Sequence, residues 1–224
     1  MRIILRLSPN TKPVPFDHLH NLTGAIHKWL GDNSLHDGLS LYSFGWLRGG
    51  KPRDKQGLDF PRGSRWWISF YDATAAKACL RTLTRDPDVA FGMQIVEAQI
   101  LDDGTFGPRQ QFKTDGAVVT RERREDGSRR YLLWHEPEAD EGLTRTLRGK
   151  LKAAGFTGQH LQTSLRFDRS YPGAKTKLST IKGIKHKGSL CPIIVEGTPE
   201  AVAFAYTVGV GELTGSGFGG LQTL

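Results

Sequence analysis

Apolar and polar residues alternate in short stretches along the first half of the chain, and this pattern predicts strands. The opening segment 2–7, Arg-Ile-Ile-Leu-Arg-Leu, is one of them. The segment 17–31 differs, because Leu19, Leu22 and Ile26 recur at the three- and four-residue spacings of an amphipathic helix. The same pattern predicts further strands at 39–48, 65–71 and 91–101 and a second helix at 73–85. The order is therefore βαββαβ, which is typical of a ferredoxin-like sheet covered by two helices.

An aspartate stands close to the start of each of these helices. Asp17 and Asp72 are predicted to be the N-caps, because a carboxylate accepts hydrogen bonds from the free N–H groups of a first helical turn. Asp86-Pro87 is expected to end the second helix, since proline disfavours helical geometry in the residue before it.

The second half of the chain repeats this order with more insertions. The segment 103–113, which contains glycine and proline, predicts a boundary, and we expect domains at 1–105 and 114–224. The elements predicted after it are strands near 116–122, 129–134, 162–168, 176–185, 189–196 and 217–223 and helices near 138–154 and 198–207. A second, more decorated ferredoxin-like unit fits them. The expected fold class is α+β, with tandem ferredoxin-like βαββαβ domains of which the second ends in a glycine-rich loop.

Charge and composition narrow the class of partner. The chain has 31 Lys and Arg residues against 23 Asp and Glu residues, a net charge of +8, which favours a polyanionic partner. No apolar run approaches the ~20 residues that a membrane helix needs, and no signal-peptide core follows Met1. Cys79 and Cys191 lie in unrelated contexts and support neither a disulfide nor a zinc site. We expect a cytoplasmic protein that does not bind membranes.

Glycine is concentrated near the end of the chain. Six of the twelve residues 209–220 are glycine, which is costly because glycine loses more backbone freedom on folding than any other residue. Such a loop allows another backbone to approach closely. It is neither a dinucleotide fingerprint, which would need glycine at Thr214, nor a nucleotide-triphosphate loop, which needs Gly-Lys-Ser/Thr. A turn built from helix-capping glycines is the alternative to phosphate binding.

Several motifs at the two ends of the chain form an ordered set. An opening strand, a helix, a Leu35-His36-Asp37 turn and a Tyr42-Ser43 strand are followed at the far end by Gly-Val-Gly, five residues and Gly-Phe-Gly. In this the chain resembles the CRISPR-associated repeat-RNA endoribonucleases of the RAMP superfamily. The resemblance covers roughly 1–51 and 198–224. It implies tandem ferredoxin-like domains and cleavage of precursor CRISPR RNA into guides.

The resemblance also implies a mechanism. The 2′-hydroxyl of the RNA attacks the adjacent phosphorus and leaves a 2′,3′-cyclic phosphate and a 5′-hydroxyl, without metal or cofactor. Histidine suits the acid and the base, because both of its forms are populated near neutral pH. In the family pattern the turn histidine, here His36, is catalytic, and His27 stands where the family often has tyrosine. Some members carry a lysine shortly after the turn histidine, which this chain lacks; the cations nearby are Lys28, Arg48 and Lys51.

RNA binding has its own candidates. Lysines alternate with apolar residues around a predicted turn near Gly183, so they can follow the phosphates of a strand. A solvated hairpin protected by lysine is the alternative. The residues expected to bind RNA are Lys175, Lys177, Lys182, Lys185, Lys187, Gly209, Gly211, Gly215, Gly217 and Gly219.

Two functions of the same superfamily stay open at this point. The first is the metal-independent endoribonuclease, and the second is a non-catalytic subunit that holds a guide RNA, which would have no need of the pair His27 and His36. A general RNA-recognition module would need an aromatic-rich sheet motif that the chain lacks. The expected partners are the precursor and product CRISPR repeat RNA, and the sequence leaves open an effector ribonucleoprotein complex and a homodimer.

Overall fold

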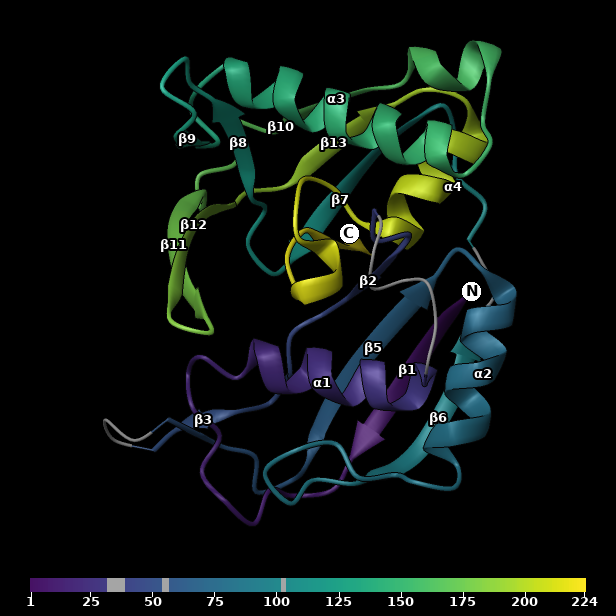
Figure 1. Ribbon diagram of the computed structural model, residues 1–224, viewed down its shortest axis with the longest axis vertical. Coiled ribbons are helices and arrows are strands. Elements are labelled where there is room, and N and C mark those ends of the chain that lie inside the picture. The colour runs from purple at the N-terminus through teal and green to yellow at the C-terminus, as the bar shows by residue number, and fades with distance from the viewer. Residues whose placement is uncertain (32–38, 54–56, 102–103) are drawn as a thin grey trace.

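The first half of the chain forms the predicted ferredoxin-like unit. The computed structural model describes residues 1–31, 39–53, 57–101 and 104–224. Four strands form an antiparallel sheet in the order β2-β5-β1-β6, and two helices cover it (Figure 1). These elements are β1 (Arg2–Leu7), α1 (Leu19–Leu30), β2 (Tyr42–Phe44), β5 (Ser64–Phe70), α2 (Ala73–Leu83) and β6 (Ile95–Leu101). A small ladder of β3 (Lys51–Pro52) and β4 (Leu58–Asp59) lies between β2 and β5 in the chain.

The alternation of residues explains which face of this sheet is covered. Ile3, Leu5 and Leu7 of β1 point into the core, while Arg6 lies on the other face, paired across the sheet with Arg65. The apolar stripe of α1 packs on the core side, where Trp29 is fully buried.

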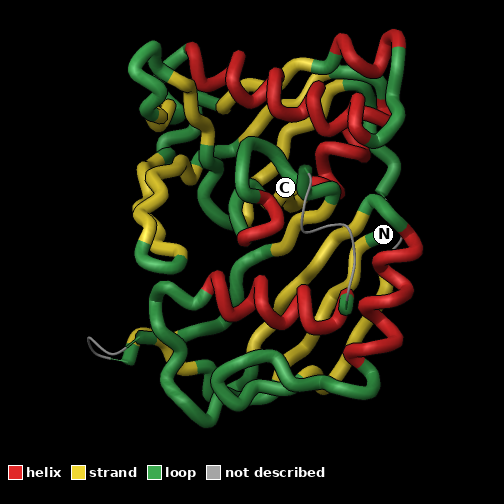
Figure 2. The backbone as a smooth tube through the Cα atoms, viewed as in Figure 1, coloured by secondary structure: helices red, strands yellow, loops and turns green. Residues whose placement is uncertain are grey.

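The second half of the chain forms a second ferredoxin-like unit, so the predicted tandem fold is confirmed. Its sheet has the order β10-β13-β7-β14, which repeats the order of the first. The main elements are β7 (Arg109–Asp115), α3 (Glu138–Ala153), β10 (Ser164–Phe167), β13 (Ile193–Glu196), α4 (Pro199–Val208) and β14 (Gly220–Thr223). The additions are the hairpin β8 (Thr120–Arg123) and β9 (Arg129–Leu132), the hairpin β11 (Lys175–Ile181) and β12 (Ile184–Leu190), and the 3-10 turns η2 (Gly158–Gln162) and η3 (Thr214–Ser216). Figure 2 shows α1 lying across the strands of the first unit and α3 across those of the second.

Local details depart from the sequence in three places. β7 begins at Arg109, inside the stretch 103–113 predicted as a boundary, because Phe112 belongs to the second core. The turn predicted near Gly183 is confirmed at Lys182 and Gly183, both with positive φ, and it divides the predicted strand 176–185 between the two strands of a hairpin. Asp17 is not the N-cap of α1, since the cap position is His18 and no side chain caps it, whereas the carboxylate of Asp72 accepts from the N–H of Thr74 at 2.7 Å as predicted.

Side chains of the two units contact one another and hold the two sheets together. The guanidinium of Arg2 lies over the rings of Trp67 and Tyr206, 3.9 and 3.7 Å from their centres, and donates to the carbonyl of Tyr206. The buried carboxylate of Asp115 accepts hydrogen bonds from Trp67 at 2.7 Å and from Gln222 at 2.8 Å. Groups of one unit can therefore be held in fixed positions against the other. No described helix is long and apolar enough to cross a membrane.

Candidate active site

His27 lies near the end of α1, beside the apolar stripe of that helix. Leu22 and Ile26 anchor the stripe in the core, so the neighbouring position of His27 is half-buried rather than free in solvent. Its Nε2 lies 3.0 Å from the hydroxyl oxygen of Tyr42, and the two rings meet edge to face. Tyr42 is the first residue of β2 and is 2 % exposed. The strand therefore fixes the hydroxyl that orients the imidazole.

The second partner of Tyr42 defines which atom carries the proton. The Tyr42 hydroxyl also lies 3.2 Å from the carbonyl oxygen of Gly215 in η3. A carbonyl only accepts, so the single hydroxyl proton is donated to Gly215, and the Tyr42 oxygen accepts from Nε2–H of His27. Burial raises the pKa of Tyr42 to about 12, so the hydroxyl stays protonated. A neutral His27 ring held in this way has Nδ1 as its basic atom.

The glycine-rich loop is packed inside the protein. All five of the glycines expected to contact RNA are buried. A Cβ on Gly215 would lie 2.8 Å from the Tyr42 hydroxyl, a Cβ on Gly217 2.8 Å from the ring of Phe44, and one on Gly219 would overlap a carbonyl oxygen. The close approach that requires glycine is therefore made by protein atoms. Contact of these glycines with RNA stays a prediction.

A buried lysine holds the same loop from the other side. Lys150 of α3 is 3 % exposed, and its Nζ donates to the hydroxyl of Thr214 at 2.8 Å and to the carbonyl of Val208 at 3.2 Å. Burial lowers its pKa to about 7. The sequence reading missed Lys150 and the role of Tyr42. The signal for Lys150 is its place three residues after Leu147, on the apolar stripe of α3.

The other half of the predicted pair is His36, which lies outside the described residues. The pairing of His27 with His36 therefore stays a prediction. Of the cations proposed for the scissile phosphate, Lys28 bonds to Asp86 at 2.8 Å and Arg48 pairs with the buried Asp115. Lys51 is exposed on β3.

The remaining histidines have other surroundings. His20 is exposed on α1 and His135 is exposed after β9. His160 and His186, for which the sequence shows no partner, lie within hydrogen-bond distance of Thr198 (2.7 Å) and Tyr131 (3.2 Å). Burial lowers the pKa of His186. His18 is buried and is treated below.

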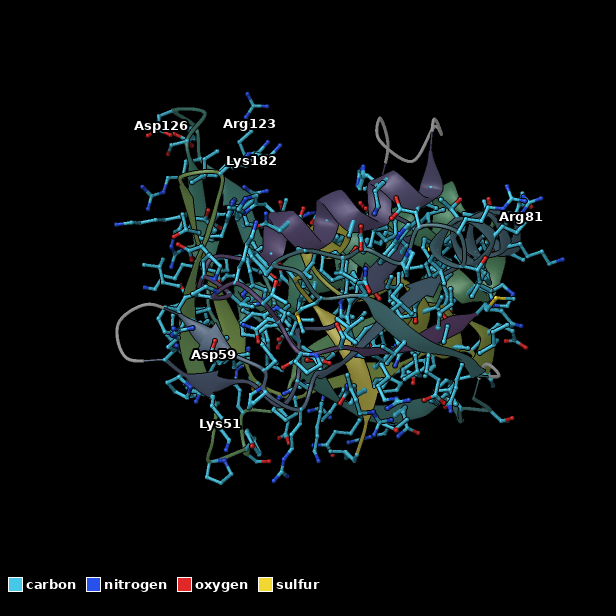
Figure 3. The ribbon with its side chains drawn as sticks, turned by 90° about the horizontal axis from the view of Figure 1, so that it is seen from below. Lys51, Asp59, Arg81, Arg123, Asp126 and Lys182 are labelled. Atoms are coloured by element: carbon cyan, nitrogen blue, oxygen red, sulfur yellow. The ribbon has the colours of Figure 1, made fainter. Side chains whose placement is uncertain are left out.

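The predicted basic hairpin is formed by β11 and β12. Its five lysines are all exposed, but the strand register divides them between the two faces. Lys185 and Lys187 share the outer face with Leu178, whereas Lys175 and Lys177 share the face of the buried Ser179. Lys182 stands at the tip, and in Figure 3 it projects from the same side of the molecule as Arg123 of β8. RNA binding by these lysines stays a prediction.

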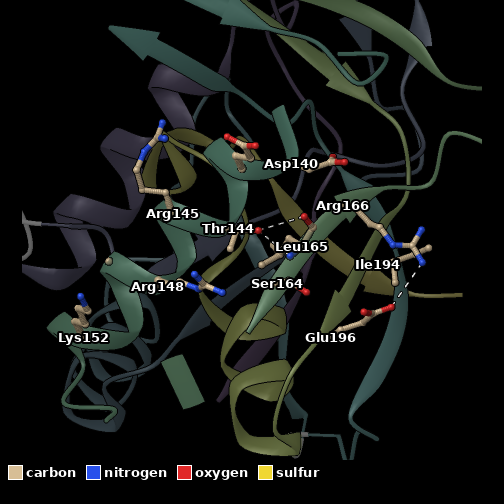
Figure 4. Close-up of a pocket in the computed structure, with 12 residues that line it drawn as sticks. Asp140, Thr144, Arg145, Arg148, Lys152, Ser164, Leu165, Arg166, Ile194 and Glu196 are labelled. Atoms are coloured by element: carbon tan, nitrogen blue, oxygen red, sulfur yellow. Dashed lines mark hydrogen bonds and ion pairs between the residues drawn. The ribbon is translucent and has the colours of Figure 1, made fainter. Parts of the chain in front are cut away.

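Another pocket lies on the second unit, between α3 and the sheet edge at β10 (Figure 4). It encloses about 710 Å³ and mixes cations such as Arg145 and Arg166 with carboxylates such as Glu196. Arg166 lies 3.6 Å from Glu196, so part of this charge is neutralised within the pocket. Its elements α3 and β10 lie near the top of Figure 1, whereas α1 lies in the lower half, and its lining includes neither His27 nor Tyr42.

Comparison of the sequence and the fold with known proteins identifies similar proteins. The family described as CRISPR associated protein Cas6, C-terminal, matches residues 102–223. A solved structure of a Cas6-related gene product from Pyrococcus furiosus is 18% identical, with a TM-score of 0.88 over 100% of this chain and 98% of that one. A CRISPR associated protein Cas6 is 22% identical (TM-score 0.82, 100% and 99% covered), and an RAMP protein binding different RNA substrates is 19% identical (TM-score 0.81, 100% and 99% covered). No curated protein matches the sequence.

Proposed function

The chain belongs to the CRISPR-associated Cas6 family, and we propose that it cuts CRISPR repeat RNA without metal, with His27 and His36 as its acid–base pair. The observation that carries the proposal is the hydrogen-bonded series from His27 through Tyr42 to the carbonyl of Gly215. An imidazole that is half-buried, held by its Nε2 and fixed in one tautomer is suited to move a proton at Nδ1. A surface histidine with no function would not need this support.

The chemistry uses the nucleophile of the RNA itself. One histidine removes the proton of a 2′-hydroxyl, and the 2′-oxygen attacks the adjacent phosphorus. The other histidine protonates the departing 5′-oxygen, which leaves a 2′,3′-cyclic phosphate and a 5′-hydroxyl end. Each proton transfer contributes about 10²–10⁴-fold to the rate. The fixed position of the His27 ring adds to this by holding one proton-transfer group in place for the reaction.

The test is cleavage of repeat RNA from the neighbouring array in excess EDTA, with the ends mapped chemically. We expect cutting to continue and the upstream fragment to end in a cyclic phosphate. A substrate with a 2′-deoxyribose immediately before the cut is expected to bind with unchanged affinity and to stay intact, because it lacks the attacking oxygen.

Two outcomes would contradict this proposal in different ways. Cutting of the deoxy substrate, or cutting that EDTA abolishes, would show that a water or metal-bound nucleophile is used instead. Tight binding of repeat RNA without any cutting would assign the chain to the non-catalytic, guide-holding alternative.

Tyr42→Phe is expected to lower kcat about 10-fold, because the transition state loses the free energy of roughly one hydrogen bond. The ring of residue 42 remains, so the packing of β2 is preserved, but the hydroxyl that orients His27 is lost. RNA affinity should not change. Single-turnover cleavage at saturating enzyme measures the rate separately from binding, and Tyr206→Phe, at the interface between the units, is the control. Equal rates for the wild type and Tyr42→Phe would show that the hydroxyl does not position His27.

Removal of the lysines at the tip and outer face of the β11–β12 hairpin is expected to weaken RNA binding. Each phosphate contact that is lost should lower the slope of log affinity against log salt by roughly 0.7–0.9. Filter binding of an uncleavable repeat RNA across a salt series gives the slope. The variant combines Lys182→Ala, Lys185→Ala and Lys187→Ala.

The control for this variant removes the same charge from other exposed surfaces, at Lys12, Lys77 and Lys152. It should leave the slope nearly unchanged. If both triple variants have the slope of the wild type, the hairpin lysines serve only to keep an exposed hairpin soluble.

A further inference from the structure

A second pocket lies between the start of α1 and the strand β11, away from His27. It encloses about 330 Å³. Phe16 and Leu178 line it although they are 57% and 53% exposed, and the half-buried Trp46 lines it as well. The indole N–H of Trp46 donates to the carbonyl of Gly217 at 2.7 Å, so this ring is fixed against the glycine-rich loop. The pocket thus offers a fixed aromatic wall and a second aromatic ring at its rim.

The buried residue His18 lines the same pocket. His18 is 7% exposed, and its Nδ1 lies 2.8 Å from the carbonyl of Pro15. Since a carbonyl only accepts, Nδ1 carries the proton and Nε2 presents a lone pair. Burial lowers the pKa of His18 and favours this neutral ring. Nε2 has no hydrogen-bond partner within the described part of the chain. Buried polar atoms are nearly always satisfied, so this one indicates a missing donor.

The free edge of β11 adds a backbone donor and acceptor. The N–H of Thr180 points away from β12 and donates to the carboxylate of Asp17 at 3.3 Å. Groups two residues apart on a strand point to the same edge, so the N–H and C=O of Leu178 also face away from β12, toward the pocket that Leu178 lines. A flat group with both a donor and an acceptor on its edge would be complementary to this strand.

The charge around the pocket selects the kind of occupant. Lys177 lines the pocket, and Lys185 and Lys187 lie on the same exposed hairpin. Asp17, the acidic residue of the lining, is already engaged by Thr180. Unpaired RNA bases typically stack on aromatic side chains while their polar edges are read by hydrogen bonds and their phosphates by cations.

We propose that this pocket holds one unpaired nucleobase of the RNA substrate, packed against Phe16 and Trp46 and read by Leu178 and His18. The proposal rests on the proposed cleavage of RNA and adds a determinant of which RNA is cut. The two acceptors, Nε2 of His18 and the carbonyl of Leu178, select a base with an exocyclic amino group. His18 and His27 lie nine residues apart on or beside α1, about 14 Å along the helix. The base therefore lies outside the scissile dinucleotide.

The test is a scan of repeat RNA in which each base is removed in turn, using a substrate made uncleavable by the 2′-deoxy substitution. Binding is measured for the wild type and for Phe16→Ala, an exposed position whose replacement leaves the core intact. For the wild type we expect one position at which base removal weakens binding about 10-fold or more. Phe16→Ala should bind the intact RNA about 10-fold more weakly, and base removal at that position should then cost little further. Val96→Ala, at a similarly exposed apolar residue, should repeat the wild-type profile.

A second substitution identifies the chemistry of the base. At the position found, inosine in place of adenosine or guanosine, or uridine in place of cytidine, removes the amino group and should weaken binding of the wild type several-fold. If Phe16→Ala and wild type give parallel binding profiles at every position, while both proteins still cut the unmodified repeat RNA, the pocket holds no base and the proposed function is unaffected. If the wild type neither binds nor cuts repeat RNA, the proposed function itself is wrong.

Discussion

His27→Ala is expected to lower the rate of repeat-RNA cleavage by about 10²-fold or more while the fold and most of the RNA affinity are kept. The loss corresponds to one proton transfer removed from the reaction. The fold should survive because His27 lies beside the apolar stripe of α1 rather than in it. Single-turnover cleavage and thermal melting measure the two effects separately.

His20→Ala is the matched control, since His20 is exposed on the same helix and its Nδ1 lies 3.1 Å from the nearby carbonyl of Asp17. It should cut at the wild-type rate.

His36→Ala is expected to lose as much activity as His27→Ala. The cleavage rate of the double variant should fall by much less than the product of the two single losses, because once the acid or the base is removed the other contributes little. The cleavage rate should follow a bell-shaped pH profile, because one ring must be neutral while the other is charged.

A different pattern among these variants would place the catalytic base elsewhere. If His27→Ala cuts at the wild-type rate and His20→Ala abolishes cutting, the reacting histidine lies on the first turn of α1. The resemblance that aligns His27 and His36 with the family would then be wrong at these positions.

The order of elements could be predicted from the sequence because it depends on local patterns. Alternation in β1 and the helical spacing of Leu22, Ile26 and Trp29 are properties of the segments themselves. The start of β7 could not be predicted in this way. It begins in a segment with the composition of a linker, and only its pairing with β13 and β14 makes it a central strand.

The site was predictable only in part, because its support comes from residues far apart in the chain. His27 could be named from its motif, but the bond between Tyr42 and Gly215 spans 173 residues. Lys150 resembles any other cation of a charged helix until η3 is packed against it. The glycines illustrate the same limit. Their density shows that some backbone approaches closely, but not that the approaching backbone is the chain's own.

The glycine-rich loop gives the second large effect, and Gly219→Ala is expected to destabilise the fold by about 3 kcal/mol or more. Gly219 has φ of +61°, which costs an L-residue roughly 1–2 kcal/mol. In addition, its Cβ would overlap the carbonyl oxygen of Val210, which belongs to the backbone and cannot move aside as the end of a flexible side chain could. For a chain of this length the melting temperature should fall by roughly 6–12 °C.

Gly127→Ala separates these two contributions. Gly127 has φ of +80° in the turn between β8 and β9, and a Cβ there would meet nothing within 4 Å. It should therefore show only the conformational cost, and the excess loss in Gly219→Ala measures the close approach of backbone within the protein. The opposite result is equally informative about the loop. If Gly219→Ala has the same melting temperature as Gly127→Ala but a lower affinity for RNA, then glycine is required at position 219 because the phosphate backbone of RNA lies there.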